Sequence, residues 1–189
     1  TPPERTQDWD ARIYALSPGN VAFLETLGAW GALDRSRVCP VRAMRIFGDD
    51  GRSQMEFSAY AAGVNALAWN VESGEVQRAL WLLLERQSNL SIVYPARPVS
   101  LDVRADATTL GTDGGHAIQS RLLVGADGAN SWVRREAGFE ADARSYGEQG
   151  VVANFACKRP HRGIALQWFR ADGVLAYLPL PGERISIVW

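Results

Sequence analysis

The run from Leu122 to Arg134 combines residue types that suit a ligand-binding turn. It reads Leu-Leu-Val-Gly-Ala-Asp-Gly-Ala-Asn-Ser-Trp-Val-Arg, so an apolar segment ends in glycine and Asp127 follows before a predicted helix. That order predicts a carboxylate at the carboxyl edge of a sheet, where α/β folds usually bind ligands. Gly125 and Gly128 would let a ligand approach the backbone, and Asp127 can accept hydrogen bonds from hydroxyls such as those of a ribose. A junction in which Asp127 only caps the helix fits the same pattern.

Arg12 is the second candidate, within the run Asp-Ala-Arg-Ile-Tyr-Ala-Leu-Ser that begins at Asp10. A predicted helix follows this run. By its residue type alone, an arginine before a helix is compatible with a solvated surface position. The local pattern therefore assigns Arg12 no role of its own.

Taken together, these motifs resemble the single-component FAD-dependent aromatic monooxygenases, in the branch of the ubiquinone-biosynthesis hydroxylases. Gly-Ala-Asp-Gly-x-x-Ser-x-Val-Arg is similar to the second signature of that family, and Asp-x-Arg-x-x-Ala-Leu-Ser is similar to the ubiquinone branch. The resemblance implies that Gly125, Asp127 and Gly128 lie by the flavin ribityl and pyrophosphate. It implies that Arg12 pairs with the FAD pyrophosphate, a task that suits the donor fork of a guanidinium.

The resemblance also implies an activity. FAD would be reduced by NADH or NADPH and would react with dioxygen to give a flavin hydroperoxide. One oxygen would then pass to an electron-rich aromatic ring, such as a polyprenylated phenol or another quinone precursor in ubiquinone biosynthesis. Because the cofactor supplies this chemistry, no catalytic side chain is assigned. His161 follows Lys-Arg-Pro in a predicted turn and is interpreted as a surface histidine.

Trp168, Phe169 and Tyr177 are the candidate substrate residues, because their rings could line an apolar pocket. Leu178 could line the same pocket. Aromatic residues on strands are also common in plain cores, and we expect at least half of these four side chains to be core. Two other functions compete with this interpretation. The first is a flavoprotein that acts on a soluble aromatic acid, which a substrate-binding arginine in the pocket would favour. The second is a non-enzymatic nucleotide-binding or interaction module.

Apolar periodicity predicts the elements that position these residues. Helices are expected from Ser17-Pro18 to near Gly28 or Gly31, from Glu75 to Arg86 and from Asn130 to Ala137. A hairpin is expected at Val41–Phe47 and Gln54–Phe57 around a Gly-Asp-Asp-Gly turn. The remaining predicted strands are Leu90–Tyr94, Val99–Val103, Thr108–Leu110, Ala117–Ile118, Leu122–Ala126, Gly150–Cys157, Ile164–Phe169, Val174–Leu178 and Ile185–Trp189.

This order of elements predicts a mixed α/β (α+β) fold. Residues 1–40 and 71–140, with a β-meander at about 90–120, are assigned to a partial Rossmann-like FAD-binding domain of the aromatic-hydroxylase type. Residues 41–70 and 141–189 are assigned to part of a mixed β-sheet domain that binds substrate. We expect Val41–Phe57 to pair with the strands after Gly150, and Leu122–Ala126 to join a separate sheet.

The composition of the chain argues against some classes of binding partner. The chain has 189 residues and a net charge of −1 at pH 7, so no excess positive charge argues for nucleic acid. Two cysteines without metal-ligand spacing predict no metal site. A cytoplasmic location in a bacterium is expected, with peripheral membrane association or a biosynthetic complex as the alternative. The oligomeric state, the ring position and the choice of nicotinamide are not specified.

Two family elements are absent from the sequence. No Gly-x-Gly-x-x-Gly turn precedes Asp10, and no Gly-Asp-Ala-x-His segment follows Trp189. Since the first of these cradles the adenosine diphosphate half of FAD, we expect the natural protein to continue. We also expect the 189-residue chain itself to lack tightly bound FAD.

Overall fold

The fold was analysed in a computed structural model that describes residues 8–142 and 144–189. Residues 1–7, at the start of the predicted FAD-binding part, and residue 143 lie outside the described residues. Contacts divide the chain into two compact units. The smaller is Ser91–Glu148, and the larger joins the chain up to Leu90 with Gln149–Trp189. These units do not coincide with the predicted domain ranges, which remain a prediction.

The larger unit begins with a three-stranded antiparallel sheet in the order β1-β5-β2. These strands are β1 (Ile13–Leu16), β5 (Ala68–Glu72) and β2 (Val38–Val41). Their side chains alternate between the two faces. Val71 is fully buried against the helices, whereas Asn70 and Glu72 are buried on the opposite face. The central strand therefore serves an apolar core on one side and a polar junction on the other.

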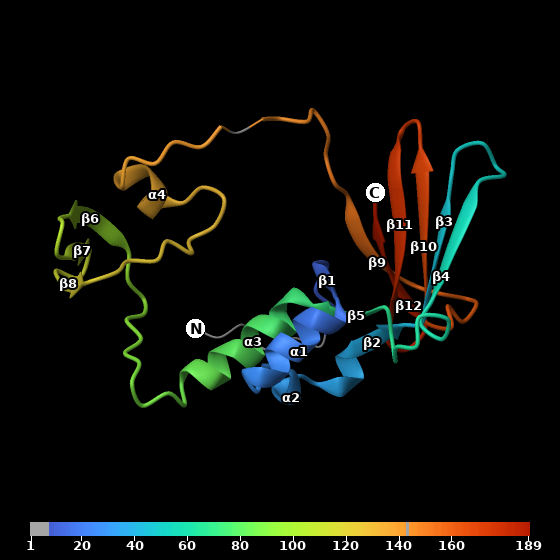
Figure 1. Ribbon diagram of the computed structural model, residues 1–189, viewed down its shortest axis with the longest axis horizontal. Helices are drawn as coiled ribbons and strands as arrows, with labels where there is room; N and C mark the ends of the chain where they lie inside the picture. Colours follow the sequence, from blue (N-terminus) through green and yellow to red (C-terminus); the bar gives the residue numbers. More distant parts are fainter. Residues whose placement is uncertain (1–7, 143) are drawn as a thin grey trace. The chain divides into compact units, whose positions relative to one another are not determined.

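Three helices pack on the apolar face of this sheet: α1 (Pro18–Thr26), α2 (Ala29–Ala32) and α3 (Ser73–Leu84) (Figure 1). Ser17 caps α1 by accepting a hydrogen bond from the Asn20 N–H, with proline at the first helical position. The helices and sheet enclose one apolar cluster, within which Trp30 meets Trp69 edge to face with centroids 5.9 Å apart. The predicted first and second helices are confirmed.

The second sheet of the larger unit has six strands in the order β4-β3-β10-β11-β12-β9. Its strands are β3 (Ala43–Phe47), β4 (Gln54–Ser58), β9 (Val152–Ala156), β10 (Ile164–Arg170), β11 (Gly173–Leu180) and β12 (Arg184–Val188). The predicted hairpin is confirmed, with Ala43 opposite Ser58. Its pairing with the later strands is also confirmed, because β3 runs parallel to β10 with Phe47 opposite Trp168.

One continuous stretch of chain joins the two sheets. The strand β2 ends at Val41, and β3 begins in the other sheet at Ala43. Between them, the Arg42 N–H donates to the Gly163 carbonyl at 2.7 Å, and the Arg42 carbonyl accepts from the Ala59 N–H at 2.9 Å. The crossing residue is therefore held by hydrogen bonds on both sides of its backbone.

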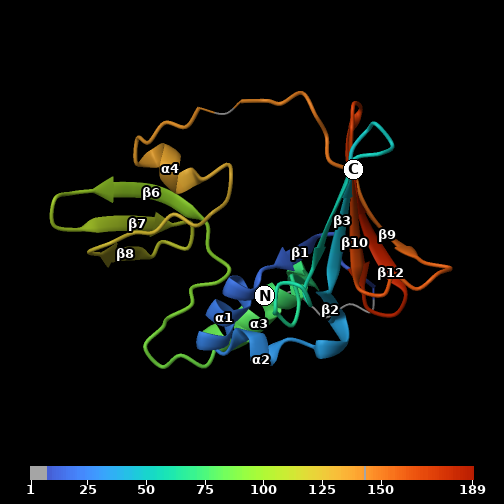
Figure 2. The same cartoon turned by 45° about the vertical axis from the view of Figure 1, so that its right-hand side comes forward.

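The smaller unit holds an antiparallel meander of β6 (Pro98–Val103), β7 (Thr108–Thr112) and β8 (Ala117–Ser120), followed by the short helix α4 (Trp132–Glu136). Figure 2 shows the three strands side by side. The predicted meander and the helix after it are confirmed, and the helix is shorter than expected because Ser131 caps it one residue after the predicted start.

Two predicted strands are wrong. Residues 122–126 form no strand and pair with none of the strands in the described part of the chain. An extended segment without a hydrogen-bonded neighbour keeps its side chains in solvent, and Leu122 and Val124 are 77% and 73% exposed. Residues 90–94 likewise form no strand, and their large apolar side chains are exposed. Apolar content alone does not supply a partner strand.

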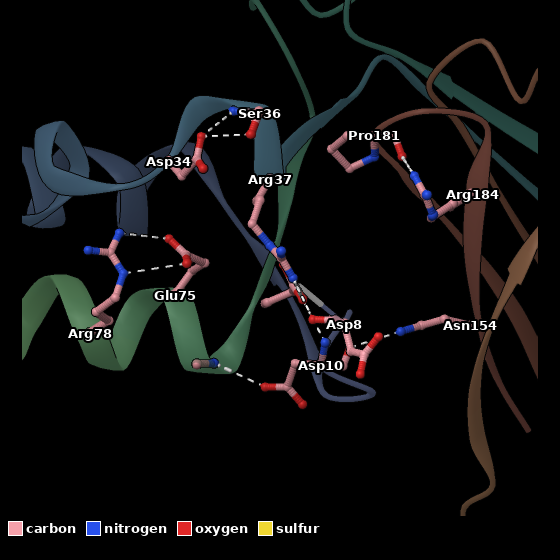
Figure 3. A network of polar contacts seen from close by, with 12 residues as sticks. Asp8, Asp10, Asp34, Ser36, Arg37, Glu75, Arg78, Asn154, Pro181 and Arg184 are labelled. Atoms are coloured by element: carbon pink, nitrogen blue, oxygen red, sulfur yellow. Dashed lines mark hydrogen bonds and ion pairs between the residues drawn. The ribbon is translucent and has the colours of Figure 1, made fainter. Parts of the chain in front are cut away.

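A buried ion pair fills the polar junction beneath β5. The Arg37 guanidinium binds both carboxylate oxygens of Glu72, whose side chain is 2% exposed. The hydrogen bonds that Arg37 donates to Glu72 raise the pKa of Arg37 above its usual value. Glu72 also accepts the Asp10 N–H at 2.6 Å, and the guanidinium lies 4.6 Å from the Trp9 ring centroid. The pair thus ties the segment before β1 to the central strand (Figure 3).

We predict that Arg37→Met lowers the free energy of unfolding by about 3–5 kcal/mol, because it leaves a buried carboxylate without its counter-charge. Urea denaturation measures this. Arg45→Met is the matched control, since Arg45 pairs with Glu56 at side-chain exposures of 47% and 53%. Its loss should stay below about 1 kcal/mol. Equal losses in the two variants would contradict the assigned role of the buried pair.

Candidate functional site

Arg12 lies in a cleft of the larger unit with a volume of about 680 Å³. Its side chain is exposed, and among residues 8–142 and 144–189 its guanidinium has no hydrogen-bonded or ion-paired partner. The cleft is lined by the following residues: Asp10, Ala11, Arg12, Ile13, Ser73, Gln77, Val152 and Val188. A guanidinium with unused donors at the wall of a cleft is suited to bind an anionic group.

The same cleft contains the N-terminus of α3. The Ser73 N–H donates to the Arg12 carbonyl at 2.9 Å, and the Gly74 N–H donates to Asp10 Oδ2 at 3.0 Å. A helix N-terminus carries partial positive charge, and here the Asp10 carboxylate caps it. The backbone of Ser73 and Gly74 therefore fastens the Arg12 segment to the start of α3.

Asp127 lies in the smaller unit and acts as a helix cap. Its Oδ1 accepts from the Ser131 hydroxyl at 2.5 Å, and its Oδ2 accepts from the N–H groups of Trp132 at 2.7 Å and Val133 at 3.1 Å. The Ser131 hydroxyl in turn accepts the Arg134 N–H at 3.0 Å. Of the two interpretations of this motif, the capping role is therefore confirmed, and a role towards a ribose stays a prediction.

These hydrogen bonds fix the charge of the cap. The pKa of Asp127 is lowered to about 2. The hydrogen bond from the Ser131 hydroxyl contributes most to this shift, followed by the one from the Val133 N–H. The carboxylate is therefore ionised at every pH near neutrality. It faces solvent as an anion, able to accept further hydrogen bonds but not to donate a proton.

Glycine suits positions 125 and 128 of the motif for two different structural reasons. A Cβ at Gly125 would meet Val133 Cβ and Cγ1 at 3.0 Å, so the absence of a side chain lets the segment pack against α4. Gly128 has φ 89°, a left-handed conformation that favours glycine. Both residues also line an apolar cavity of about 450 Å³ between the 122–128 segment, α4 and the meander. Their contact with a ligand stays a prediction.

The three candidate substrate residues do not share one environment. Trp168 stacks on Phe47 with centroids 5.4 Å apart and meets Tyr177 edge to face at 4.9 Å. Phe169 projects to the opposite face by strand alternation and is 49% exposed. Val152 and Val188 line the Arg12 cleft. They lie in one cross-strand row with Ala176 and Gln167, and Gln167 is on the same face of β10 as Phe169. Trp168 and Tyr177 thus form part of an aromatic stack on the face away from the cleft.

His161 is a structural residue. Its Nε2 lies 2.8 Å from the Leu180 carbonyl, and its Nδ1 accepts the Gly163 N–H at 3.0 Å. Because Nδ1 accepts, the proton lies on Nε2 and is donated to Leu180. The ring is half-buried rather than a free surface group, and it has no role in the cleft.

Asp10, Arg37, Glu72 and Asn154 were not singled out by sequence reasoning. Asp10 belongs to the run that also holds Arg12, so its proximity was a usable signal. The others are far apart in sequence and come together only through the topology. Asn154 Nδ2 donates to the Asp10 carbonyl at 2.9 Å across 144 positions of sequence.

Residues 99–187 match the family model for an FAD binding domain. The chain is 32% identical over 180 residues to the 3-demethoxyubiquinol 3-hydroxylase of Escherichia coli K12, covering 95% of the chain and 46% of the relative. It is 31% identical over 181 residues to the ubiquinone hydroxylase UbiL of Rhodospirillum rubrum, covering 96% and 42%. Nearly the whole chain is therefore similar to part of each of these two hydroxylases, and residues 99–187 carry the FAD binding domain match. It spans less than half the length of these curated hydroxylases.

A solved structure shares the fold of the chain. A mutant of PqsL from P. aeruginosa superposes with a TM-score of 0.80 at 17% identity, covering 98% of the chain and 52% of PqsL. The mixed α/β fold class is thereby confirmed. Within the described residues, no helix is long and apolar enough to cross a membrane.

The pH dependence of the cap is testable. Because the pKa of Asp127 is lower in the folded than in the unfolded state, its stabilising contribution is complete above about pH 4. That contribution is lost as the pH falls towards the folded pKa of about 2. We predict that the Asp127 carboxyl carbon titrates near this value by NMR, and that Asp127→Asn removes this part of the acid dependence. A titration midpoint near 4 would contradict the capping geometry.

Gly125→Ala should destabilise the smaller unit by about 1–3 kcal/mol, because the added methyl group overlaps Val133. The indole NMR signal of Trp132 in α4 follows the unfolding of this unit. Adding Val133→Ala to Gly125→Ala should restore part of the loss by making room. Gly114→Ala is the control in the same unit, since the nearest atom to a Cβ there, His116 Cδ2, lies at 3.4 Å. The idea fails if Val133→Ala adds to the loss instead.

Proposed function

We propose that the protein carrying this chain is an FAD- and NAD(P)H-dependent hydroxylase of an electron-rich aromatic ring, a polyprenylated phenol of ubiquinone biosynthesis. One observation carries the proposal: Arg12, with unused donors, shares a cleft with the N-terminus of α3 and with the six-stranded sheet. The names of the two curated relatives support the reaction and the pathway.

The residues of the cleft fit the pyrophosphate of FAD. The guanidinium of Arg12 supplies a planar pair of donors, and the hydrogen bonds from Ser73 and Gly74 hold its backbone beside the first turn of α3. Gln77 adds a neutral amide that can donate and accept hydrogen bonds. When bound, FAD supplies the redox chemistry, with NADH or NADPH as reductant and dioxygen as oxidant. The chain's own residues bind, orient and exclude water.

The sheet face beside the cleft suits an apolar substrate. The cross-strand row on this face consists of Ile46, Gln167, Ala176, Val188 and Val152. None of these five side chains is charged, and the cation of the cleft, Arg12, is assigned to the pyrophosphate of FAD, so this row offers no cation to the carboxylate of a soluble aromatic acid. The row therefore favours a phenol with an apolar substituent. Phe169 lies on the same face and extends this surface.

The substrate class has a consequence for location. A polyprenyl tail partitions into lipid, so a cytoplasmic enzyme that acts on it would work at a membrane surface or within a biosynthetic complex. This part of the proposal concerns partners and location. A fractionation experiment, with and without added substrate, tests it separately from the activity.

The complete protein should purify yellow and convert prenylated phenols in preference to soluble aromatic acids, which a product assay over a panel of both measures.

We predict that Arg12→Met weakens FAD binding about tenfold to a hundredfold, because charge-assisted hydrogen bonds are lost. The FAD affinity of Arg12→Lys should lie between those of the wild type and Arg12→Met, because lysine keeps the positive charge but lacks the paired donors of the guanidinium. Arg45→Met, on the exposed hairpin, is the control. Unchanged FAD affinity in Arg12→Met would remove the cleft from the cofactor site.

A further inference from the structure

We propose that Asp10 is a positioning residue for the cofactor, which holds the Arg12 segment and the N-terminus of α3 in one arrangement. The inference rests on the proposed function, because it assumes that Arg12 meets the FAD pyrophosphate. Asp10 acts through these two elements and makes no contact of its own with the cofactor.

Both carboxylate oxygens of Asp10 are engaged by backbone donors from the two elements. Oδ1 accepts the Arg12 N–H at 2.9 Å, and Oδ2 accepts the Gly74 N–H at 3.0 Å. The Arg12 carbonyl accepts the Ser73 N–H at 2.9 Å, which closes the connection from the other side. The backbone of Arg12 is therefore fixed to the first turn of α3 by three hydrogen bonds, two of them through one side chain.

The backbone of Asp10 is anchored in turn to two different sheets. Its N–H donates to Glu72 Oε1 at 2.6 Å, and its carbonyl accepts from Asn154 Nδ2 at 2.9 Å. Glu72 ends β5, and Asn154 lies on β9 of the six-stranded sheet. Figure 3 shows Asp10 between the start of α3 and Asn154. The residue therefore links the anion-binding segment to the sheet whose face receives the substrate.

The charge of Asp10 argues against a direct contact with phosphate. A carboxylate repels an anion at close range, and this one lines the same cleft as Arg12. Its two oxygens instead satisfy N–H groups, as a cap does. The benefit to an anionic ligand is indirect, because an arginine whose backbone is already fixed loses less freedom on binding.

The test compares Asp10→Asn with Asp50→Asn in the complete flavoprotein. Asp50 is a matched control, because its carboxylate also accepts two backbone N–H groups, from Arg52 at 3.0 Å and Ser53 at 2.7 Å. It lies in the β3–β4 turn and does not line the cleft. In Asp10→Asn the amide keeps the size of the side chain but can accept with only one atom, so one of the two N–H groups faces another donor. In Asp50→Asn the Oδ1 atom that accepts both N–H groups is kept, and the amide nitrogen faces the Ser53 hydroxyl, which can accept.

Three quantities are measured in each variant: the Kd of FAD, the thermal midpoint of the apoprotein, and kcat at saturating FAD. Asp10→Asn should raise the Kd of FAD about tenfold or more, with kcat restored at saturating FAD. Asp50→Asn, the same change of charge at a turn away from the cleft, should leave the Kd of FAD unchanged. The split between Kd and kcat separates positioning from general loss of structure.

Two results overturn the inference. The first is an FAD affinity of Asp10→Asn equal to that of the wild type. The second is an equal rise of Kd in both variants, which would make the effect one of stability alone. Failure of the wild type itself to bind FAD is a different outcome, because it would refute the proposed function first. Loss of kcat at saturating FAD would instead place Asp10 in the chemistry.

Discussion

The buried pair of Arg37 and Glu72 is the interaction on which the larger unit depends. Its carboxylate, 2% exposed, receives the guanidinium on one side and the Asp10 N–H on the other. A buried charge is tolerated only when its partners are held in place, so this pair requires β5, the residues before β1 and the start of β2 to stay together. The cleft that contains Arg12 is assembled at the edge of this polar junction.

The strand β5 serves the fold and the site at once because its side chains alternate. Val71 and Trp69 face the helices and complete the apolar core, while Asn70 and Glu72 face the second sheet. Asn70 Nδ2 donates to the Pro179 carbonyl at 2.9 Å, so the junction extends along β11. Apolar burial thus supplies stability on one face, and directional hydrogen bonds set the position of the sheets on the other.

Local signals predicted the helices, the hairpin, the meander and the later strands, because periodicity and turn residues are encoded within a few positions. The short strands β1, β2 and β5 were missed, since each has only four or five residues and is defined by distant partners. The strand predicted at Leu122–Ala126 is absent, because apolar character alone does not provide a neighbouring strand to pair with. At the site, Arg12 and Asp127 could be found from motifs, whereas Glu72 and Asn154 depend on contacts 62 and 144 positions away from Asp10.

The passage of the chain from β2 to β3 has a mechanical consequence. Arg42 is the single residue between the two sheets, and both its N–H and its carbonyl are bonded to other segments. Turning one sheet against the other about Arg42 would break these two hydrogen bonds. The β9 and β12 wall of the Arg12 cleft is therefore coupled through this joint to the three-stranded sheet.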